Sequence, residues 1–279
     1  MIYGIVGLGV MGGSYARKLM SLQETVYGFA RRKDTIDLAM KSHYISDGTT
    51  DFADGLLSRC DIVVLCLYPT LVPKWLEENQ QYLKSGCEIM DISGVKTGII
   101  IPAQNAITRN DIELISTHPM CGRESRGIEF SDPNIFNGAN YIVVPTEKNS
   151  EKAIEDAMRL GRKLGCTNIS TLTIDKHDHM IGFLSQLTHV IAVSLMNTHE
   201  SEELVNFTGD SFRDLTRIAS INEDMWTELF LLNKKILLEE IDAFDDALIH
   251  FREALETENT DEMKRLFIQS TQRRKKFNR

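Results

Sequence analysis

The segment Ile2-Tyr3-Gly4-Ile5-Val6-Gly7-Leu8-Gly9-Val10-Met11-Gly12 decides the fold of this chain. It begins as an apolar strand, continues into a GxGxxG turn and is followed by a predicted helix over residues 14–20. In this motif the first glycine permits a tight turn, the second lets the backbone approach a pyrophosphate, and the third lets the helix lie close to the strand. The helix N-terminus then holds the anion. We therefore predict a dinucleotide-binding corner made of Gly7, Leu8, Gly9, Val10, Met11 and Gly12.

The end of the second predicted strand indicates which nucleotide is bound. Residues 25–29 (TVYGF) are followed by Ala30, Arg31 and Arg32. NAD-preferring units carry an acidic side chain here for the ribose 2′-hydroxyl, whereas two guanidiniums suit a 2′-phosphate. The sequence favours NADP. NAD is the alternative if both arginines are solvated and Asp34 binds the ribose.

Strands and helices alternate along the next part of the chain. The pattern predicts strands at 61–67, 88–91, 113–116, 140–145 and 167–174, with helices at 72–83, 99–106 and 150–164. This alternation builds a doubly wound parallel sheet. Beyond it, the pattern predicts long helices at 177–197, 225–255 and 260–273. We expect an α/β fold, with a Rossmann domain at 1–173 and an all-α domain for substrate binding and dimerisation at 174–279.

Composition excludes several other classes of protein. The net charge of −9, from 31 basic and 40 acidic residues, argues against a nucleic-acid surface. No run of 18 apolar residues predicts a membrane span, and the chain starts on a strand rather than on a signal peptide. The five cysteines include no CxxC pair, so we expect reduced thiols in a cytoplasmic protein and no metal site.

Three clusters carry side chains suited to chemistry. Residues 91–96 (DISGVK) and 118–124 (HPMCGRE) each follow a predicted strand, where doubly wound folds place ligands. His118 is suited to accept a proton near neutral pH. Arg213 and Arg217 are four residues apart, so on one helix they share a face that can bind a carboxylate. The structural alternatives are a polar turn, a loop histidine, and a surface on which Asp214 pairs with Arg217 beside a buried Trp226.

Together these clusters resemble the prephenate and arogenate dehydrogenases of tyrosine biosynthesis, over nearly the whole chain. Residues 118–124 match that family's His-Pro-x-x-Gly-x-Glu loop, and His177-Asp178 with residues 185–189 (SQLTH) match its His-Asp…Ser-His-x-x-His signature. Residues 212–219 and Trp226 match its substrate-binding stretch. Three positions depart from the family pattern, because Gly94 stands where the family usually has serine, Gln186 where it has the first histidine, and Thr188 where it usually has proline.

The resemblance implies a role for each matching residue. His118 would take the proton of the substrate's ring hydroxyl while hydride leaves for the nicotinamide, with Ser93 as a second catalytic candidate. Arg217 would bind a substrate carboxylate, and His189 would line the side-chain end of the pocket. The other substrate-binding candidates are Arg213, Glu124, Asp214 and Trp226.

The activity implied is oxidative decarboxylation of prephenate to 4-hydroxyphenylpyruvate by a homodimer. Arogenate as substrate, and a non-catalytic NADP-binding regulator, stay open as alternatives.

Overall fold

A computed structural model describes residues 1–123 and 125–277 of the chain. These residues form two compact units, which meet in the sequence between Asn233 and Lys234. The first unit holds a sheet and helices, and the second is helical. Within the first unit the last strand ends at Thr171 and the next helix begins at Ile174. The domain boundary after residue 173 stays a prediction.

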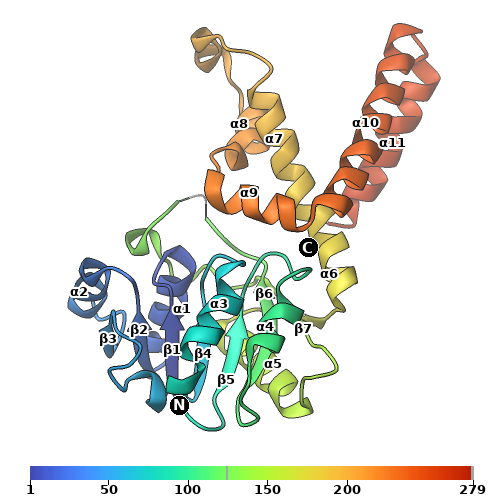
Figure 1. Cartoon of the computed structure of the whole chain (residues 1–279). Coiled ribbons are helices and arrows are strands. Elements are labelled where there is room, and N and C mark those ends of the chain that lie inside the picture. The colour runs from blue at the N-terminus through green and yellow to red at the C-terminus, as the bar shows by residue number, and fades with distance from the viewer. Residues whose placement is uncertain (124, 278–279) are drawn as a thin grey trace. The chain divides into compact units, whose positions relative to one another are not determined.

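An eight-stranded sheet, in the order β3-β2-β1-β4-β5-β6-β7-β8, forms the centre of the first unit (Figure 1). Its strands are β1 (Ile2–Val6), β2 (Thr25–Phe29), β3 (Asp47–Thr49), β4 (Ile62–Leu65), β5 (Glu88–Asp91), β6 (Glu113–Pro119), β7 (Asn140–Val144) and β8 (Asn168–Thr171). Pairing is parallel from β3 to β6, whereas β7 pairs antiparallel with β6 and parallel with β8. The doubly wound parallel sheet is confirmed, with two reversed strands at one edge.

Helices cover both faces of this sheet (Figure 1). Apolar side chains of α1 (Val10–Ser21), α2 (Lys33–Lys41) and α5 (Glu151–Leu164) pack on one face, and those of α3 (Leu71–Asn79) and α4 (Ile100–Ala106) on the other. β4 and β5 are buried along their whole length. Burial on both faces explains their continuous apolar sequence. Because β1, β4, β5 and β6 pair in parallel, their carboxyl ends lie at the same edge of the sheet.

The remaining elements of the first unit are helical. They are α6 (Ile174–Ile181), a π-helical segment η4 (Gly182–Leu187), α7 (Thr188–Met196), η5 (Glu202–Phe207), α8 (Asp210–Thr216), η6 (Arg217–Ala219) and α9 (Glu223–Leu232). Short 3₁₀ turns lie earlier in the chain, at η1 (Leu57–Arg59), η2 (Gln80–Tyr82) and η3 (Ile128–Phe130). The second unit consists of α10 (Lys234–Glu256) and α11 (Thr260–Lys275).

Side-chain caps set several helix starts. Ser150, Thr173, Asn222 and Asn259 each accept a hydrogen bond from a backbone N–H in the first turn of α5, α6, α9 and α11. Gly165 ends α5 in the left-handed conformation, with φ of 98°. These local signals explain why the helix predicted at 150–164 is found almost unchanged.

The single helix predicted over 225–255 is wrong. The helix is interrupted at Asn233. The side-chain Nδ2 of this residue donates to the backbone oxygen of Asp178 at 3.0 Å and to Oε1 of Gln186 at 2.7 Å. Asn233 is buried with φ −110° and ψ 22°, so α9 ends before it. Because its partners are far away in sequence, apolar periodicity gave no sign of the break.

The run Ile174–Met196 is long and apolar enough to cross a membrane, with mean hydropathy of 1.4. It also buries His177, Asp178 and Gln186, which hydrogen-bond within the first unit. Core helices of soluble proteins meet the same criterion of length and composition. Its hydropathy therefore gives only weak support for a membrane span.

Candidate active site

The glycine corner after β1 has the geometry that a pyrophosphate requires. Gly7 has φ of +92°, and a Cβ there would lie 2.4 Å from the backbone oxygen of Cys66. A Cβ on Gly12 would lie 1.9 Å from the backbone oxygen of Gly7. At Gly9 a Cβ would meet nothing within 4 Å. The first and third glycines are thus needed for packing, and the second leaves space for a ligand.

The start of α1 faces this space. Gly9 precedes the helix and has no side chain to cap it, and the first helical bond joins Gly13 N–H to Gly9 oxygen at 2.8 Å. The amides of Val10, Met11 and Gly12 are therefore in position to bind an anion. Leu8 is buried beneath the turn. The residues present fit a dinucleotide.

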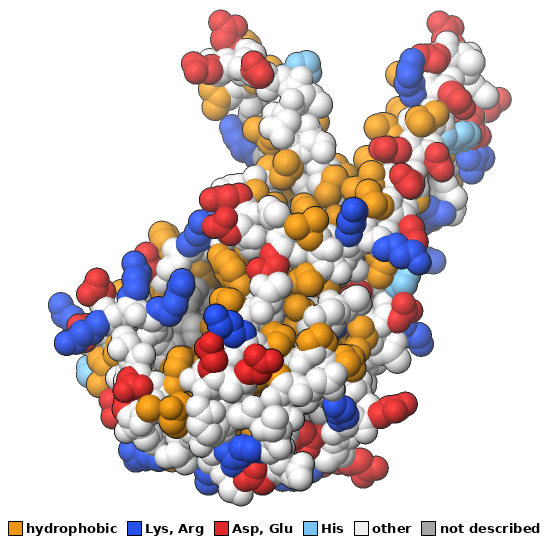
Figure 2. Space-filling model, in the orientation of Figure 1, with side chains coloured by type: hydrophobic (Ala, Val, Ile, Leu, Met, Phe, Trp, Pro, Cys, Tyr) orange, Lys and Arg blue, Asp and Glu red, His pale blue; other side chains and the backbone are white. Residues whose placement is uncertain are grey.

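The residues that bear on nucleotide choice lie just after β2. Ala30 N–H donates to Thr49 oxygen at 3.4 Å, which ties the chain to the end of β3. Arg31 and Arg32 are both exposed, and Figure 2 shows basic side chains gathered over the region of α2. Nη2 of Arg32 lies 3.5 Å from Oγ1 of Thr35. Two exposed cations therefore lie at the end of β2, where the ribose of a dinucleotide is bound in Rossmann folds.

A buried lysine joins the loops that follow β5 and β6. Nζ of Lys96 donates to Oδ2 of Asp91 at 3.2 Å, to Ser93 oxygen at 2.6 Å and to Thr117 oxygen at 2.8 Å. Burial lowers the pKa of Lys96, and Asp91 partly offsets that effect. Lys96 thereby fixes the backbone immediately before His118. The structural role of Lys96 is not evident from the sequence.

Ser93 is engaged inside the protein. Its hydroxyl donates to Oδ1 of Asp91, and the side chain is buried. A Cβ on the neighbouring Gly94 would lie 3.4 Å from Cδ2 of Leu229, an ordinary contact. The hydroxyl at position 93 is therefore used to hold the loop, while position 94 has room for a side chain. A direct role for Ser93 in the reaction stays a prediction.

His118 lies near the end of β6 and contacts a buried histidine of α6. Its Nδ1 is 2.9 Å from Nε2 of His177, and Nδ1 of His177 is 2.7 Å from Oδ1 of Asp178. His177 and Asp178 are fully buried, whereas His118 is partly exposed. Burial lowers the pKa of His118 well below its usual value of 6.5, and His177 and Lys96 act in the same direction. His118 is therefore held as a neutral imidazole that can accept a proton.

The ring of Trp226 lies against the imidazole of His189, and its role as an aromatic wall of the substrate site stays a prediction. The two ring centroids are 3.7 Å apart at 31°, and Nδ1 of His189 donates to Ser185 oxygen at 2.8 Å. Helix α7, which carries His189, also packs on η6, where Arg217 lies. His189, Trp226 and Arg217 are thus grouped by three elements of the first unit. Trp226 is only partly buried.

The remaining substrate-binding candidates are less closely defined. The predicted helix carrying Arg213 and Arg217 on one face ends at Thr216, and Arg217 begins the 3₁₀ turn η6. Nη1 of Arg213 lies 3.5 Å from Asp210. Asp214 is exposed, and the ion pair with Arg217 is not among those of the described residues. Glu124 lies outside the described residues.

Gln186, which stands in the π-helical segment, has a structural part. Its Nε2 donates to Leu229 oxygen at 2.9 Å and its Oε1 accepts from Asn233. These bonds tie η4 to the end of α9. Segments of π-helix are often found at functional sites, and this one connects the helix of His177 to that of His189.

Helix α9 is also tied to loops at the carboxyl edge of the sheet. Thr70 N–H, after β4, donates to Oε1 of Glu228 at 2.6 Å. Arg126, after β6, forms an ion pair with Glu223. The helix that carries Trp226 is thereby tied to the segments that follow β4 and β6.

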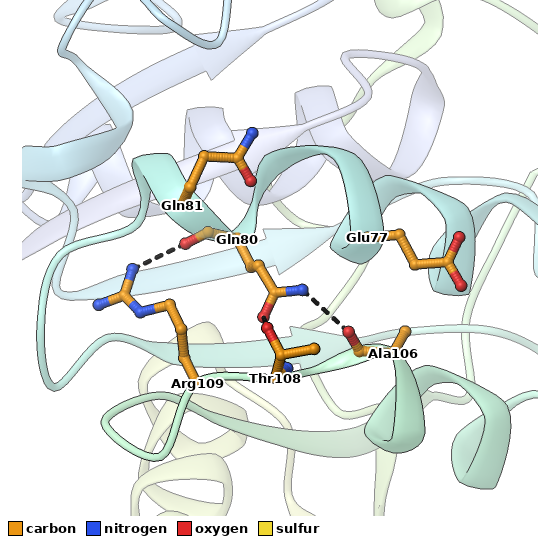
Figure 3. Close-up of a pocket in the computed structure, with 6 residues that line it drawn as sticks. All are labelled: Glu77, Gln80, Gln81, Ala106, Thr108 and Arg109. Carbon is orange, nitrogen blue, oxygen red and sulfur yellow. Dashed lines mark hydrogen bonds between the residues drawn. The ribbon is translucent and has the colours of Figure 1, made fainter.

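A surface hollow of about 360 Å³ lies elsewhere, between η2 and the end of α4 (Figure 3). Gln80 donates to Ala106 oxygen at 2.9 Å and accepts from the backbone N–H of Thr108 at 2.8 Å. Arg109 donates to Gln80 oxygen at 2.7 Å and binds Asp111. These polar groups are used in joining η2 to the α4–β6 loop, so this hollow is structural.

Two family models together match most of the chain. "Prephenate dehydrogenase, nucleotide-binding domain" matches residues 15–169, and "Prephenate dehydrogenase, dimerization domain" matches residues 173–269. The prephenate dehydrogenase of Bacillus subtilis is 26% identical over 94% of this chain and 72% of its own length.

Solved structures give the same result. A prephenate dehydrogenase of A. aeolicus, in complex with hydroxyphenyl propionate and NAD+, is 26% identical with a TM-score of 0.90, over 100% of this chain and 98% of that one. An arogenate dehydrogenase of Synechocystis is 25% identical with a TM-score of 0.82, over 99% and 100% of the two chains.

Proposed function

The chain belongs to the prephenate dehydrogenase family of oxidoreductases, and from this premise we propose that it oxidatively decarboxylates prephenate to 4-hydroxyphenylpyruvate, with NADP+ as the hydride acceptor. The observation that carries the proposal is the position of His118. A neutral, partly exposed imidazole at the carboxyl edge of the sheet is backed by two fully buried residues, His177 and Asp178. A histidine that acts as a general base is oriented by a buried carboxylate in several families of enzymes.

In the proposed reaction His118 removes the proton of the ring hydroxyl. A bound nicotinamide would supply the acceptor for the hydride that leaves the carbon bearing this hydroxyl. The carboxylate at the opposite ring carbon then leaves as carbon dioxide, and its bonding electrons make the ring aromatic. The resulting phenolate takes back a proton from His118. The protein mainly orients the substrate and moves one proton.

Arg217, His189 and Trp226 would hold the other end of the substrate. A guanidinium binds a carboxylate with two parallel hydrogen bonds, and the Trp226 ring supports the imidazole of His189. Arogenate, which carries an amino group where prephenate has a keto group, is the alternative substrate, because a relative of known structure is an arogenate dehydrogenase.

The choice of NADP rests on Arg31 and Arg32. Both are exposed beside the end of β2, and Asp34 in the first turn of α2 is the acidic residue available for an NAD ribose. A relative was crystallised with NAD+, so NAD is the alternative cofactor. All five cysteines are free, which supports a reducing, cytoplasmic location.

An absorbance assay that measures the formation of reduced nicotinamide tests the proposal. It is carried out with prephenate and with arogenate, and with each of the two cofactors. We expect the highest kcat/KM for prephenate with NADP+. A higher kcat/KM with arogenate would show that arogenate is the preferred substrate. Absence of turnover with both acids would favour the non-catalytic regulator.

The nucleotide preference is tested with Arg31→Ala. The loss of one charge-assisted phosphate contact, worth about 1.5–3 kcal/mol, should narrow the preference for NADP+ by about tenfold or more. Lys41→Ala, at the other end of α2, serves as the control. A wild-type enzyme that prefers NAD+ would contradict the assignment of both arginines.

A further inference from the structure

We infer that Asp178 and His177 are positioning residues that hold His118 in one tautomer, with the proton on Nδ1 and the lone pair of Nε2 facing the substrate. The inference rests on the proposed role of His118 as the base. It concerns two fully buried residues that act through His118. It follows from the direction of each hydrogen bond in the series that joins Asp178 to His177 and His177 to His118.

The direction is set at Asp178, which can only accept. Its carboxylate receives the backbone N–H of Lys96 at 3.0 Å and that of Thr97 at 2.6 Å. It also contacts Nδ1 of His177 at 2.7 Å. An ionised carboxylate has no proton to donate, so His177 must donate from Nδ1.

The ionised state of Asp178 is maintained by its surroundings. Burial by itself would raise the pKa of this carboxyl, but hydrogen bonds from His177 and Thr97 bring it below its usual value. The ammonium of Lys96 lies in the same buried region and is neutralised mainly by Asp91. The acceptor at the base of the chain is therefore fixed.

The proton positions on the two imidazoles follow from this acceptor. Burial lowers the pKa of His177, with a contribution from Lys96 that opposes the effect of Asp178, so the ring carries one proton. That proton is on Nδ1, which leaves Nε2 as an acceptor. Since Nε2 of His177 lies 2.9 Å from Nδ1 of His118, His118 donates from Nδ1. Its own Nε2 is then unprotonated.

This arrangement serves a base in two ways. A neutral imidazole with a free choice of tautomer would spend part of its time with Nε2 protonated and unable to accept. After proton transfer, the imidazolium of His118 keeps its bond to His177, which is itself oriented by the charge of Asp178. Asp178 stays ionised throughout and acts through His177.

Asp178→Asn is the decisive variant, because it should reverse the direction of both hydrogen bonds, the one between Asp178 and His177 and the one between His177 and His118. The Asn oxygen can keep the bond from Thr97 N–H, which places its amide N–H toward Nδ1 of His177. His177 must then carry its proton on Nε2 and donate to His118, which becomes protonated on Nε2. We expect ¹⁵N spectra of histidine-labelled free protein to show Nε2 of His118 unprotonated in the wild type and protonated in this variant. The signals are assigned by their loss in His118→Asn.

Activity gives the second measurement. With Nε2 protonated, kcat should fall by about 10² or more, the usual contribution of a positioned base, while the Kd for NADP+ is unchanged. Two further variants keep the test valid if Asp178→Asn does not fold. His177→Gln can donate its amide to Asp178 and accept from His118, whereas His177→Leu can do neither. We expect the kcat of the Gln variant to be at least tenfold higher than that of the Leu variant.

Gln104→Met is the matched control, because Gln104 is buried in the same unit and donates to Leu114 oxygen at 3.1 Å without contacting the chain of three residues. It should change stability without changing the His118 spectrum. A wild-type His118 protonated on Nε2, or equal kcat for His177→Gln and His177→Leu, would overturn the inference. The spectra do not depend on turnover, so an inactive protein with the expected tautomer would reject the proposed function and retain the inference.

Discussion

The imidazole of His118 sets the acid limit of the proposed reaction. Burial lowers its pKa well below 6.5, with His177 and Lys96 acting in the same direction, so the ring becomes protonated only at acid pH. We expect the kcat/KM for prephenate to fall as the pH is lowered, and this acid limb of the pH profile should lie below pH 6.5. His118→Asn should lower turnover by about 10² and abolish this limb, with NADP+ binding preserved. Near-normal turnover of that variant would remove His118 from the mechanism.

Arg217 is the residue on which substrate affinity should depend. A guanidinium that binds a carboxylate stabilises the ground state and the transition state alike, so its loss appears chiefly in KM. Arg217→Ala should weaken prephenate binding by about 2–3 kcal/mol, and lysine should rescue only part because it cannot form two parallel bonds.

The matched control for Arg217 is Arg252→Ala, which removes an exposed arginine that pairs with Glu256 on α10. Its KM should equal that of the wild type. An unaltered KM for prephenate in Arg217→Ala would reject the carboxylate-binding role. A lower Tm together with an equal loss of affinity for both ligands would instead indicate a structural role.

At the scale of single elements, β5 begins with a buried carboxyl that pairs with α5. Oε1 of Glu88 binds Lys152, which also donates to Asp156 at 2.7 Å, while Oε2 of Glu88 has no partner among the described residues. Burial raises the pKa of Glu88 from 4.5 to about 7, Lys152 opposes this shift, and Asp156 adds to it. The folded protein therefore takes up a proton here that the unfolded chain does not.

The burial of the Glu88 carboxyl should make stability fall as the pH rises. A pKa raised by folding gives stability that is complete below pH 4.5 and is lost as the pH passes through about 7. Glu88→Gln removes the titration, so at pH 8 its Tm should exceed that of the wild type by about 2–4 °C, the effect of about 1 kcal/mol. The advantage should vanish near pH 5. Glu78→Gln, which changes an exposed carboxyl of α3, should show no such trend.

For the whole molecule, the second unit exposes too much apolar surface for a helical hairpin in water. Large apolar side chains of α10 and α11 are more than half exposed, namely Leu248, Ile249, Leu255, Phe267 and Ile268. Figure 2 shows such side chains on the outside of helical segments. Exposed apolar stripes on paired helices usually pack against further helices. We therefore propose that this unit forms a homodimer core, as the dimerization-domain match suggests.

Light scattering at micromolar concentration should give twice the chain mass of 31.6 kDa. The double variant Leu248→Glu with Ile249→Glu should shift the protein toward monomers, because two buried charges oppose association. Lys264→Glu, an exposed change on α11, should leave the dimer intact. A stable wild-type monomer would reject the proposal.

Local chemistry let the sequence determine much of this protein by itself. The glycine corner, the order of strands and helices, the capped helix α5 and the clusters after β5 and β6 could be predicted, because each depends on neighbouring residues or on apolar periodicity. A GxGxxG turn excludes side chains wherever it occurs, and parallel strands bring their carboxyl ends to one edge. The general region of the candidate site was therefore evident.

Tertiary structure alone decided how the side chains in that region are used. His118 and His177 are 59 residues apart yet lie 2.9 Å from each other, the hydroxyl of Ser93 is taken by Asp91, and Asn233 ends α9 through bonds to Asp178 and Gln186. The reversal of β7 and β8 was equally hidden, since strand direction leaves no mark in apolar periodicity. Each of these features depends on which distant groups remain without a partner once the core has formed. Burial makes an unpaired polar group costly, so the final hydrogen bonds are selected by packing.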